Sequence, residues 1–90
     1  MTARHVFYEG RVQGIGFRYS ARQIATGYDV AGWIRNLPDG RVEMLVSGDT
    51  QELTEFLQAI RDSHLAAVVR NVTMEEAPPP AGLRGFEIIE

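Results

Sequence analysis

The sequence predicts an α+β sandwich in which two helices cover one face of an antiparallel sheet. Two observations predict this fold. The elements follow one another in the order β-α-β-β-α-β, with an extra strand at the C-terminus, and each helical segment carries a single apolar stripe that suits one face of a sheet. A chain of 90 residues has room for one modest core, so we expect residues 1–90 to form a single domain.

The first strand and the first helix are both indicated by periodicity. Residues 4–12 alternate in polarity, which is typical of a strand, and residues 17–28 place apolar side chains at helical spacing. Gly27 weakens the last turn of this helix and marks its expected end. The apolar face of the strand carries Val6, Tyr8 and Val12.

The middle of the chain predicts a β-hairpin. Residues 30–36 and 41–47 each alternate, and the turn residues Leu37-Pro38-Asp39-Gly40 separate them. Asn36 is the last residue of the first of these strands.

The remaining elements are a helix and two strands. Asp49 and Glu52 have the spacing of a capping box, which opens the second helix. Residues 68–75 alternate again, and Phe86-Glu87-Ile88-Ile89 is a short last strand. The buried stripe expected of the second helix is Leu53, Phe56, Leu57 and Ile60.

This order of elements is the split βαβ pattern of ferredoxin-like sandwiches. In such a unit, strands 4–12 and 30–36 run parallel and are joined by a right-handed crossover. Their C-terminal ends therefore meet at one edge of the sheet.

Composition excludes several classes of chemistry. There is no cysteine, so thiolate catalysis, disulfides and thiolate metal sites are absent, and all nine basic residues are Arg, so Schiff-base lysines are absent too. The net charge is −3 without a basic cluster, which argues against nucleic-acid binding. No apolar run is long enough to cross a bilayer, and the N-terminus lacks the apolar region of a signal peptide, so we expect a cytoplasmic protein.

The segment from Gly10 to Arg18 is the first candidate site. Gly14 and Gly16 allow the backbone to adopt positive φ and to approach a ligand closely, so that successive N–H groups can form an anion-binding nest. The N-terminus of the following helix adds unpaired N–H groups, and Arg18 in its first turn offers a planar fork that matches phosphate oxygens. The alternative is a simple tight turn followed by a solvated arginine.

Asn36 is the second candidate, because it should face the same edge of the sheet as that loop. Its amide can both accept hydrogen bonds from a water and donate hydrogen bonds to it. The alternative is that Asn36 and Asp39 only shape the hairpin turn.

Both segments resemble the acylphosphatase family, and the resemblance covers nearly the whole chain. Gly10-x-Val12-Gln13-Gly14-Ile15-x-Phe17-Arg18 is similar to the family signature, and Gly32-Trp33-Ile34-x-Asn36-x-x-Asp39-Gly40 is similar to its second motif. Ile15 stands where Val is common, and Pro78-Pro79-Pro80 is an individual feature.

The resemblance implies a small free-standing hydrolase of acyl phosphates that uses no metal and no other cofactor. It implies that Arg18 binds the phosphate and that Asn36 orients the attacking water. The backbone amides of the loop would share the phosphate, and they belong to Gln13, Gly14, Ile15, Gly16, Phe17 and Arg18. The expected partners are a small-molecule acyl phosphate and the product inorganic phosphate, with no membrane and no nucleic acid, and the expected form is a monomer.

Three other interpretations have a physical basis. A ferredoxin-like domain with the same loop could bind phosphate without hydrolysing a substrate. An RNA-recognition module shares the order of elements, but it needs exposed aromatic residues on its third strand, and residues 41–46 have none. Domains of this type also occur inside larger carbamoyl-transfer proteins, although the length of this chain argues for the free-standing enzyme.

Overall fold

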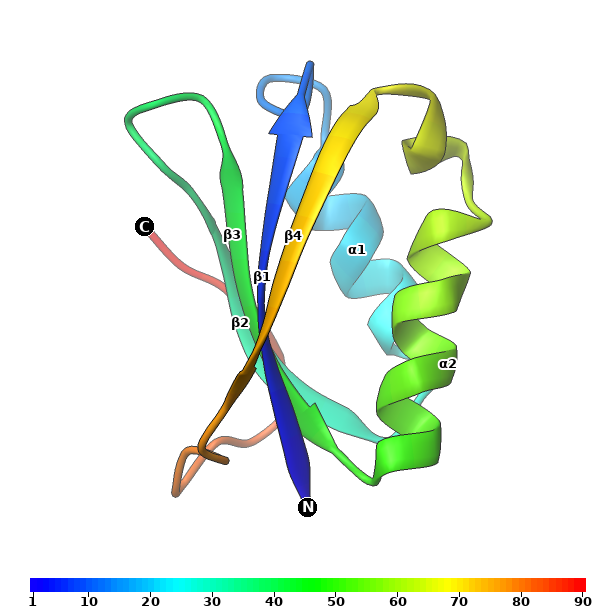
Figure 1. Ribbon diagram of the computed structural model, residues 1–90, viewed down its shortest axis with the longest axis vertical. Helices are drawn as coiled ribbons and strands as arrows, with labels where there is room; N and C mark the ends of the chain where they lie inside the picture. Colours follow the sequence, from blue (N-terminus) through cyan, green and yellow to red (C-terminus); the bar gives the residue numbers. More distant parts are fainter.

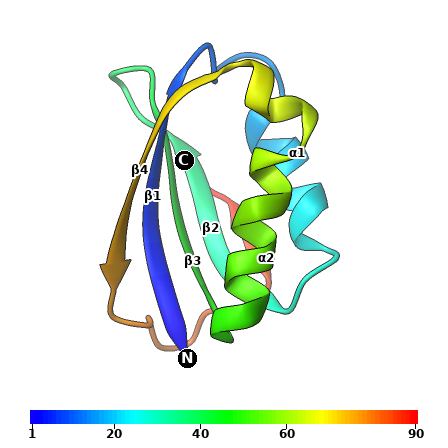
Figure 2. The ribbon, with the colours of Figure 1, turned by 45° about the vertical axis from the view of Figure 1, so that its right-hand side comes forward.

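The computed structural model describes residues 1–90 and contains one five-stranded sheet in the order β4-β1-β3-β2-β5. The ferredoxin-like α+β fold predicted from the sequence is confirmed. Both helices lie on the same side of the sheet (Figure 1, Figure 2). The elements are β1 (Thr2–Gly10), α1 (Phe17–Ala25), β2 (Val30–Asn36), β3 (Val42–Gly48), α2 (Thr50–Arg61), a short 3₁₀ helix (His64–Ala67), β4 (Val69–Ala77) and β5 (Phe86–Ile88).

The C-terminal ends of β1 and β2 meet at one edge of the sheet, as the split βαβ pattern predicts. Both strands pair antiparallel with β3, which lies between them. Val42 of β3 is paired with Tyr8 on one side and with Asn36 on the other, so the two strands finish at nearly the same level. The loop after β1 and the hairpin after β2 therefore lie side by side at the top of the molecule (Figure 1).

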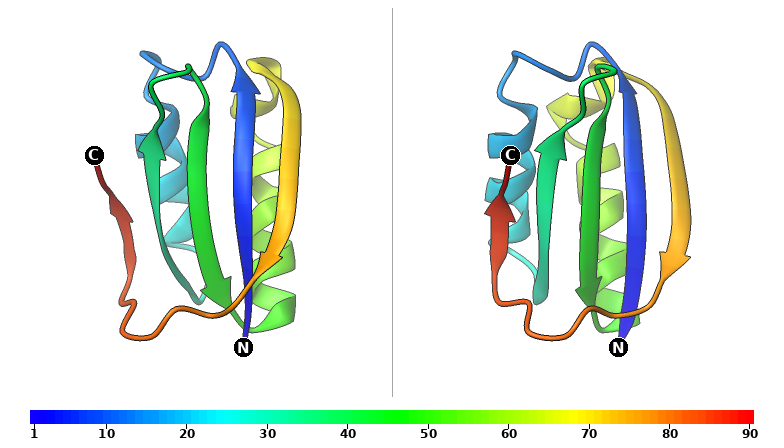
Figure 3. Two further views of the ribbon diagram at one scale, coloured as in Figure 1. Left: turned by 60° about the vertical axis from the view of Figure 1, so that its left-hand side comes forward. Right: turned by 90° about the vertical axis from the view of Figure 1, so that its left-hand side faces the viewer.

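The last strand joins the sheet in a way that periodicity did not predict. β5 pairs parallel with β2, with Ile34 opposite Ile88, whereas β4 lies at the opposite edge beside β1. The segment between these two strands runs across the lower end of the sheet from one edge to the other (Figure 3). The C-terminal strand thus ends beside Ile34 of β2 rather than beside β4.

The core fills the space between the sheet and the helices. Phe17 and Ala21 of α1 and Phe56 and Ile60 of α2 pack against the buried side chains of β1, β2 and β3. The strand residues of this core are Val6, Tyr8, Ile34, Val42, Met44 and Val46. Neither helix is long and apolar enough to cross a bilayer.

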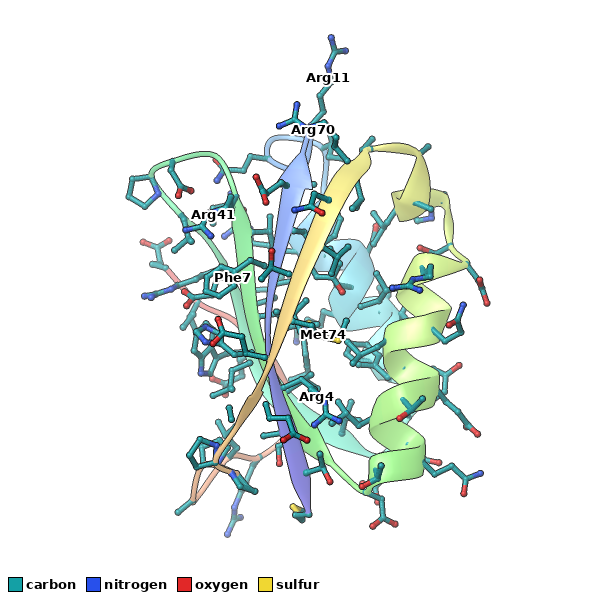
Figure 4. The ribbon with its side chains drawn as sticks, viewed as in Figure 1. Arg4, Phe7, Arg11, Arg41, Arg70 and Met74 are labelled. Carbon is teal, nitrogen blue, oxygen red and sulfur yellow. The ribbon has the colours of Figure 1, made fainter.

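The opposite face of the sheet is open and carries a polar network. Glu43 is only 7% exposed, and its two carboxylate oxygens accept hydrogen bonds from Arg35 Nε (2.5 Å) and His5 Nε2 (2.6 Å). Burial acts to raise the pKa of Glu43, but the hydrogen bonds from Arg35 and His5 outweigh it and hold that pKa below its usual range. Beside this network the Arg41 guanidinium lies 4.7 Å from the centre of the Phe7 ring (Figure 4).

The first strand and the first helix both end earlier than the sequence predicts. The first strand ends at Gly10 rather than at residue 12, because its pairing with β4 slips between Glu9 and Gly10. The first helix ends at Ala25, earlier than residue 28, with Thr26 as its C-cap.

The predicted capping box at Asp49 and Glu52 is wrong. Asp49 is the N-cap of α2, but its side chain forms no cap hydrogen bond. Glu52 instead accepts a hydrogen bond from the backbone N–H of Asp29 at 2.8 Å. The carboxylate therefore ties α2 to the residue that precedes β2, a tertiary contact that the local spacing could not reveal.

Candidate active site

A small cavity of about 140 Å³ opens where β1 and β2 end. It brings together the two side chains that the sequence singled out, Arg18 and Asn36, which come from different motifs. The other lining residues are Val12, Gly14, Gly16, Phe17, Tyr19 and Ile88. The cavity is therefore apolar on part of its wall and polar where the loop, Arg18 and Asn36 meet.

The loop owes its shape to two glycines in the left-handed region. Gly14 has φ of 78° and Gly16 has φ of 82°, values that residues with a Cβ rarely adopt. A Cβ at either position would meet nothing within 4 Å, so glycine is required by the backbone conformation and not by lack of room. Such turns direct successive N–H groups toward one side, which favours an anion.

The N-terminus of α1 lies directly behind this loop. Gly16 is its N-cap, so no side chain caps the first N–H groups of the helix, and no acidic residue lies in the first turn. The unpaired N–H groups and the positive end of the helix dipole are consequently free to bind a negative ligand. A capping carboxylate here would compete with an anion for the same donors.

Arg18 is half-buried in the wall of the cavity and has no charged partner in the protein. The ion pairs of the chain involve Arg4, His5, Arg35 and Arg41 only. An unpaired guanidinium beside a glycine-rich loop and a helix N-terminus suits a ligand with several negatively charged oxygens.

Asn36 carries the single buried side-chain polar atom of the protein that has no hydrogen-bond partner, its Oδ1. Leaving such an oxygen unsatisfied costs about 1–3 kcal/mol. The alternative role in the hairpin turn falls to Asp39, whose Oδ1 accepts from the Arg41 N–H at 3.1 Å. That backbone hydrogen bond is the main reason that the pKa of Asp39 is lowered. The Asn36 side chain takes no part in the turn and is available to a ligand or water.

Gln13 joins the two halves of the site through its side chain. Its Nε2 donates to the backbone oxygen of Leu37 at 2.7 Å and to that of Arg41 at 2.9 Å. These carbonyls lie at the base of the β2–β3 turn, which Leu37 N–H also closes by donating to the Arg41 oxygen at 2.8 Å. The loop is thus fastened to the hairpin one residue after Asn36. Sequence reasoning assigned Gln13 only a backbone role.

The remaining predicted loop residues divide into two groups. Gly14, Gly16 and Phe17 line the cavity, whereas Gln13 and Ile15 do not. Ile15 is 50% exposed and points away from the core. Sequence reasoning missed Ile88 and Tyr19 as wall residues. The alternation of Phe86 and Ile88 was visible, but not that β5 would lie beside β2.

The chemistry available in the cavity is limited by its residue types. No histidine and no carboxylate lines it, so no side chain there is an effective general base at neutral pH. No group of three or more histidine, aspartate or glutamate side chains suited to a metal ion occurs in the chain. What the site offers is hydrogen-bond donors for an oxyanion and one amide beside it.

Fold and cavity together define the class of this protein as a small ferredoxin-like domain with a cavity lined by Arg18, Asn36 and a glycine-rich loop at one edge of its sheet. The sequence profile of the acylphosphatases matches residues 4–88. The chain therefore belongs to the acylphosphatase family, enzymes that hydrolyse acyl phosphates.

Individual relatives agree with this assignment. An acylphosphatase of Trichormus variabilis is 48% identical over 93% of this chain and 82% of the relative. One from Bacillus velezensis is 42% identical over 98% of both chains. The crystal structure of acylphosphatase from Bacillus subtilis superposes with a TM-score of 0.89 at 33% identity, covering all of both chains.

Proposed function

We propose that this chain hydrolyses the carboxyl-phosphate bond of an acyl phosphate by direct in-line attack of water on phosphorus. In this proposal the loop amides of residues 13–18 and the Arg18 guanidinium hold the phosphate, and Asn36 orients the water. The observation that carries it is the convergence of an unpaired guanidinium and an unpartnered amide oxygen on one cavity. Residues 1–90 would act as one domain.

The proposed division of labour follows from the demands of phosphoryl transfer. The transferring group carries its charge on three equatorial oxygens, and the attacking and leaving oxygens must lie in line. N–H groups and a guanidinium meet the first demand because they are donors fixed in advance around the oxygens. Asn36 meets the second demand, since its Oδ1 can accept a hydrogen bond from water and so point a lone pair of the water oxygen at phosphorus.

Bond changes in the proposed step balance without a cofactor. The water oxygen forms a bond to phosphorus as the bond from phosphorus to the carboxylate oxygen breaks. The carboxylate leaves with that electron pair, and the proton of the water passes to a phosphate oxygen or to solvent. Asn36 is too weak a base to take the proton, so its proposed role is positioning.

The decisive experiment is hydrolysis of acetyl phosphate and benzoyl phosphate in ¹⁸O-labelled water with a chelator present. The proposal expects the label in inorganic phosphate and expects inorganic phosphate to inhibit competitively. Label in the carboxylate would mean attack at the carbonyl carbon and would contradict it. Phosphate binding without any hydrolysis would instead identify a binding module.

Stereochemistry tests for a covalent intermediate. A chiral, isotopically labelled phosphoryl group should be inverted by a single in-line displacement. Retention of configuration would indicate two displacements and a phosphorylated residue. The cytoplasm as the place of action and the monomer as the acting form stay predictions from the sequence.

A further inference from the structure

A second and larger cavity lies away from the proposed active site, between α2 and β4. Its volume is about 350 Å³, and it shares no lining residue with the cavity that holds Arg18 and Asn36. A volume above 300 Å³ is in the range of sites that hold small organic molecules. Figure 1 shows that the 3₁₀ helix lies above α2 and connects it to the upper end of β4.

Most of the lining of this groove is apolar, and α2 leaves part of β4 uncovered there. Val72 and Met74 face the helix side of the sheet, and Met74 is still 40% exposed. Leu57 and Ile60 of α2 form the opposite wall. In Figure 4 the Met74 side chain lies between the strand and the helix. Of the four exposed large hydrophobic side chains in the protein, this is the one that lies in a groove of this size.

Tyr8 gives the groove a polar group that lacks a partner. Its side chain belongs to the groove lining and is only 3% exposed, yet no protein group forms a hydrogen bond with its hydroxyl. Tyrosine hydroxyls in largely buried side chains ordinarily find such a partner. The only fully buried side-chain polar atom without a partner is Asn36 Oδ1, so the Tyr8 hydroxyl is still accessible from the groove that the residue lines. Burial raises the pKa of Tyr8 well above its usual value, although the positive charge of Arg61 opposes this, so the hydroxyl is a neutral donor.

The charge around the groove is positive, although the protein as a whole is negative. Arg61 and Arg70 line it, and neither takes part in an ion pair. Arg4 lies in the adjoining hollow together with Arg61 and Met74, and its partner Glu76, at 3.7 Å, has an 85% exposed side chain. No carboxylate lines either hollow. The pattern complements a ligand with one anionic head and an apolar body.

We propose that the groove between α2 and β4 binds an amphipathic carboxylate, with its alkyl chain between Leu57 and Met74 and its head group at Tyr8 and Arg61. The Tyr8 hydroxyl donates to one carboxylate oxygen, and the guanidinium of Arg61 donates to the other. Arg70 adds a second positive charge at the upper end. This site is separate from the phosphate cavity, and its occupation does not depend on the proposed reaction.

The test uses decanoate as the probe, below the concentration at which it forms micelles, with the full chain in isothermal titration calorimetry. We expect one decanoate per chain, with affinity unchanged by saturating inorganic phosphate. Decanol should bind at least tenfold more weakly, because it cannot satisfy the guanidinium. Absence of binding, competition by phosphate, or equal affinity for decanol would each overturn the proposal.

Two substitutions sharpen the assignment. Tyr8→Phe removes only the hydroxyl and should weaken decanoate binding about tenfold, since it removes a hydrogen bond to a charged oxygen. Arg61→Gln should weaken it by a similar factor, whereas the matched control Arg22→Gln on α1 should not. Amide chemical shifts of the unaltered protein give an independent readout, and they should move along β4 and α2. Shifts confined to the loop of residues 11–16 would contradict the site.

Discussion

Two neighbouring residues of β2 show that polar side chains have partners within the protein on one face of the sheet and lack them on the other. Arg35 points to the open face, where it and His5 satisfy both oxygens of the buried Glu43 carboxylate. Asn36 points into the small cavity, where its Oδ1 has no partner and the nearby Arg18 has no counter-ion. Polar groups that are paired within the chain support the fold, whereas those left unpaired at a cavity are free for a ligand.

Among the groups without partners in the protein, Arg18 should cause the largest loss of activity when it is substituted. Arg18→Ala removes a preorganised charged donor, so we expect kcat/KM for acetyl phosphate to fall by roughly 10²–10³, which is about 2.7–4 kcal/mol. The thermal midpoint should stay unchanged, because Arg18 has no protein partner to lose. Arg18→Lys should not restore activity, since a point charge cannot reproduce the fork. Near-normal turnover in the lysine variant would exclude bidentate binding, and Arg22→Ala is the control.

Asn36→Ala should give the next largest effect. We expect kcat to fall by about 10², while inhibition by inorganic phosphate is largely kept, because the variant loses the water-orienting group and not the anion nest. Its free energy of unfolding should equal or exceed that of the unaltered protein, since an unsatisfied buried oxygen is removed. Steady-state kinetics and denaturant titration measure both quantities. Loss of phosphate affinity with kcat intact would reverse the assignment.

Glu43→Gln tests the polar network on the open face of the sheet, where the side chains have partners within the protein. The change removes the buried negative charge that Arg35 and His5 both contact. We therefore expect the free energy of unfolding to drop by about 1–3 kcal/mol. Activity per folded molecule should be retained, because the open face does not reach the cavity. Equal stability of the variant would show that the network contributes nothing to the fold.

The same carboxylate predicts a pH dependence. The pKa of Glu43 is lower in the folded protein than its ordinary value, so the unfolded chain binds its proton first as the pH falls. Its contribution to stability is full above the ordinary glutamate pKa and is lost as the pH falls through the folded value. Denaturant titrations across the acidic range should therefore show a shallower loss of stability in Glu43→Gln.

Gln13→Met should have a smaller effect that links the two halves of the site. The change keeps the length of the side chain but removes both donors to Leu37 and Arg41, so we expect about a tenfold fall in kcat with little change in phosphate inhibition. In an Asn36→Ala background the same change should cost no further activity, since Gln13 acts by positioning Asn36. Additive losses would assign Gln13 a role independent of Asn36.

The order of helices and strands was predictable because the apolar periodicity of each element is local in the sequence. The meeting of the two motifs was predictable because β1 and β2 run parallel and therefore end at the same edge of the sheet. Arg18 and Asn36 meet on one cavity for that reason. Alternation identifies the face of a strand but not its neighbour, so the parallel pairing of β5 with β2 could not be foreseen. The Gln13 tether and the contact between Glu52 and Asp29 were missed for a related reason, because each joins residues far apart in the chain.

The position of β5 has a consequence for how activity is lost. This strand forms one edge of the sheet, has only three residues, and supplies Ile88 to the wall of the small cavity. Short edge strands detach at a lower free-energy cost than the centre of a sheet. Mild heat or denaturant should therefore abolish hydrolysis while the circular dichroism signal of the helices is still native. Activity would then detect the loss of native structure earlier than circular dichroism does.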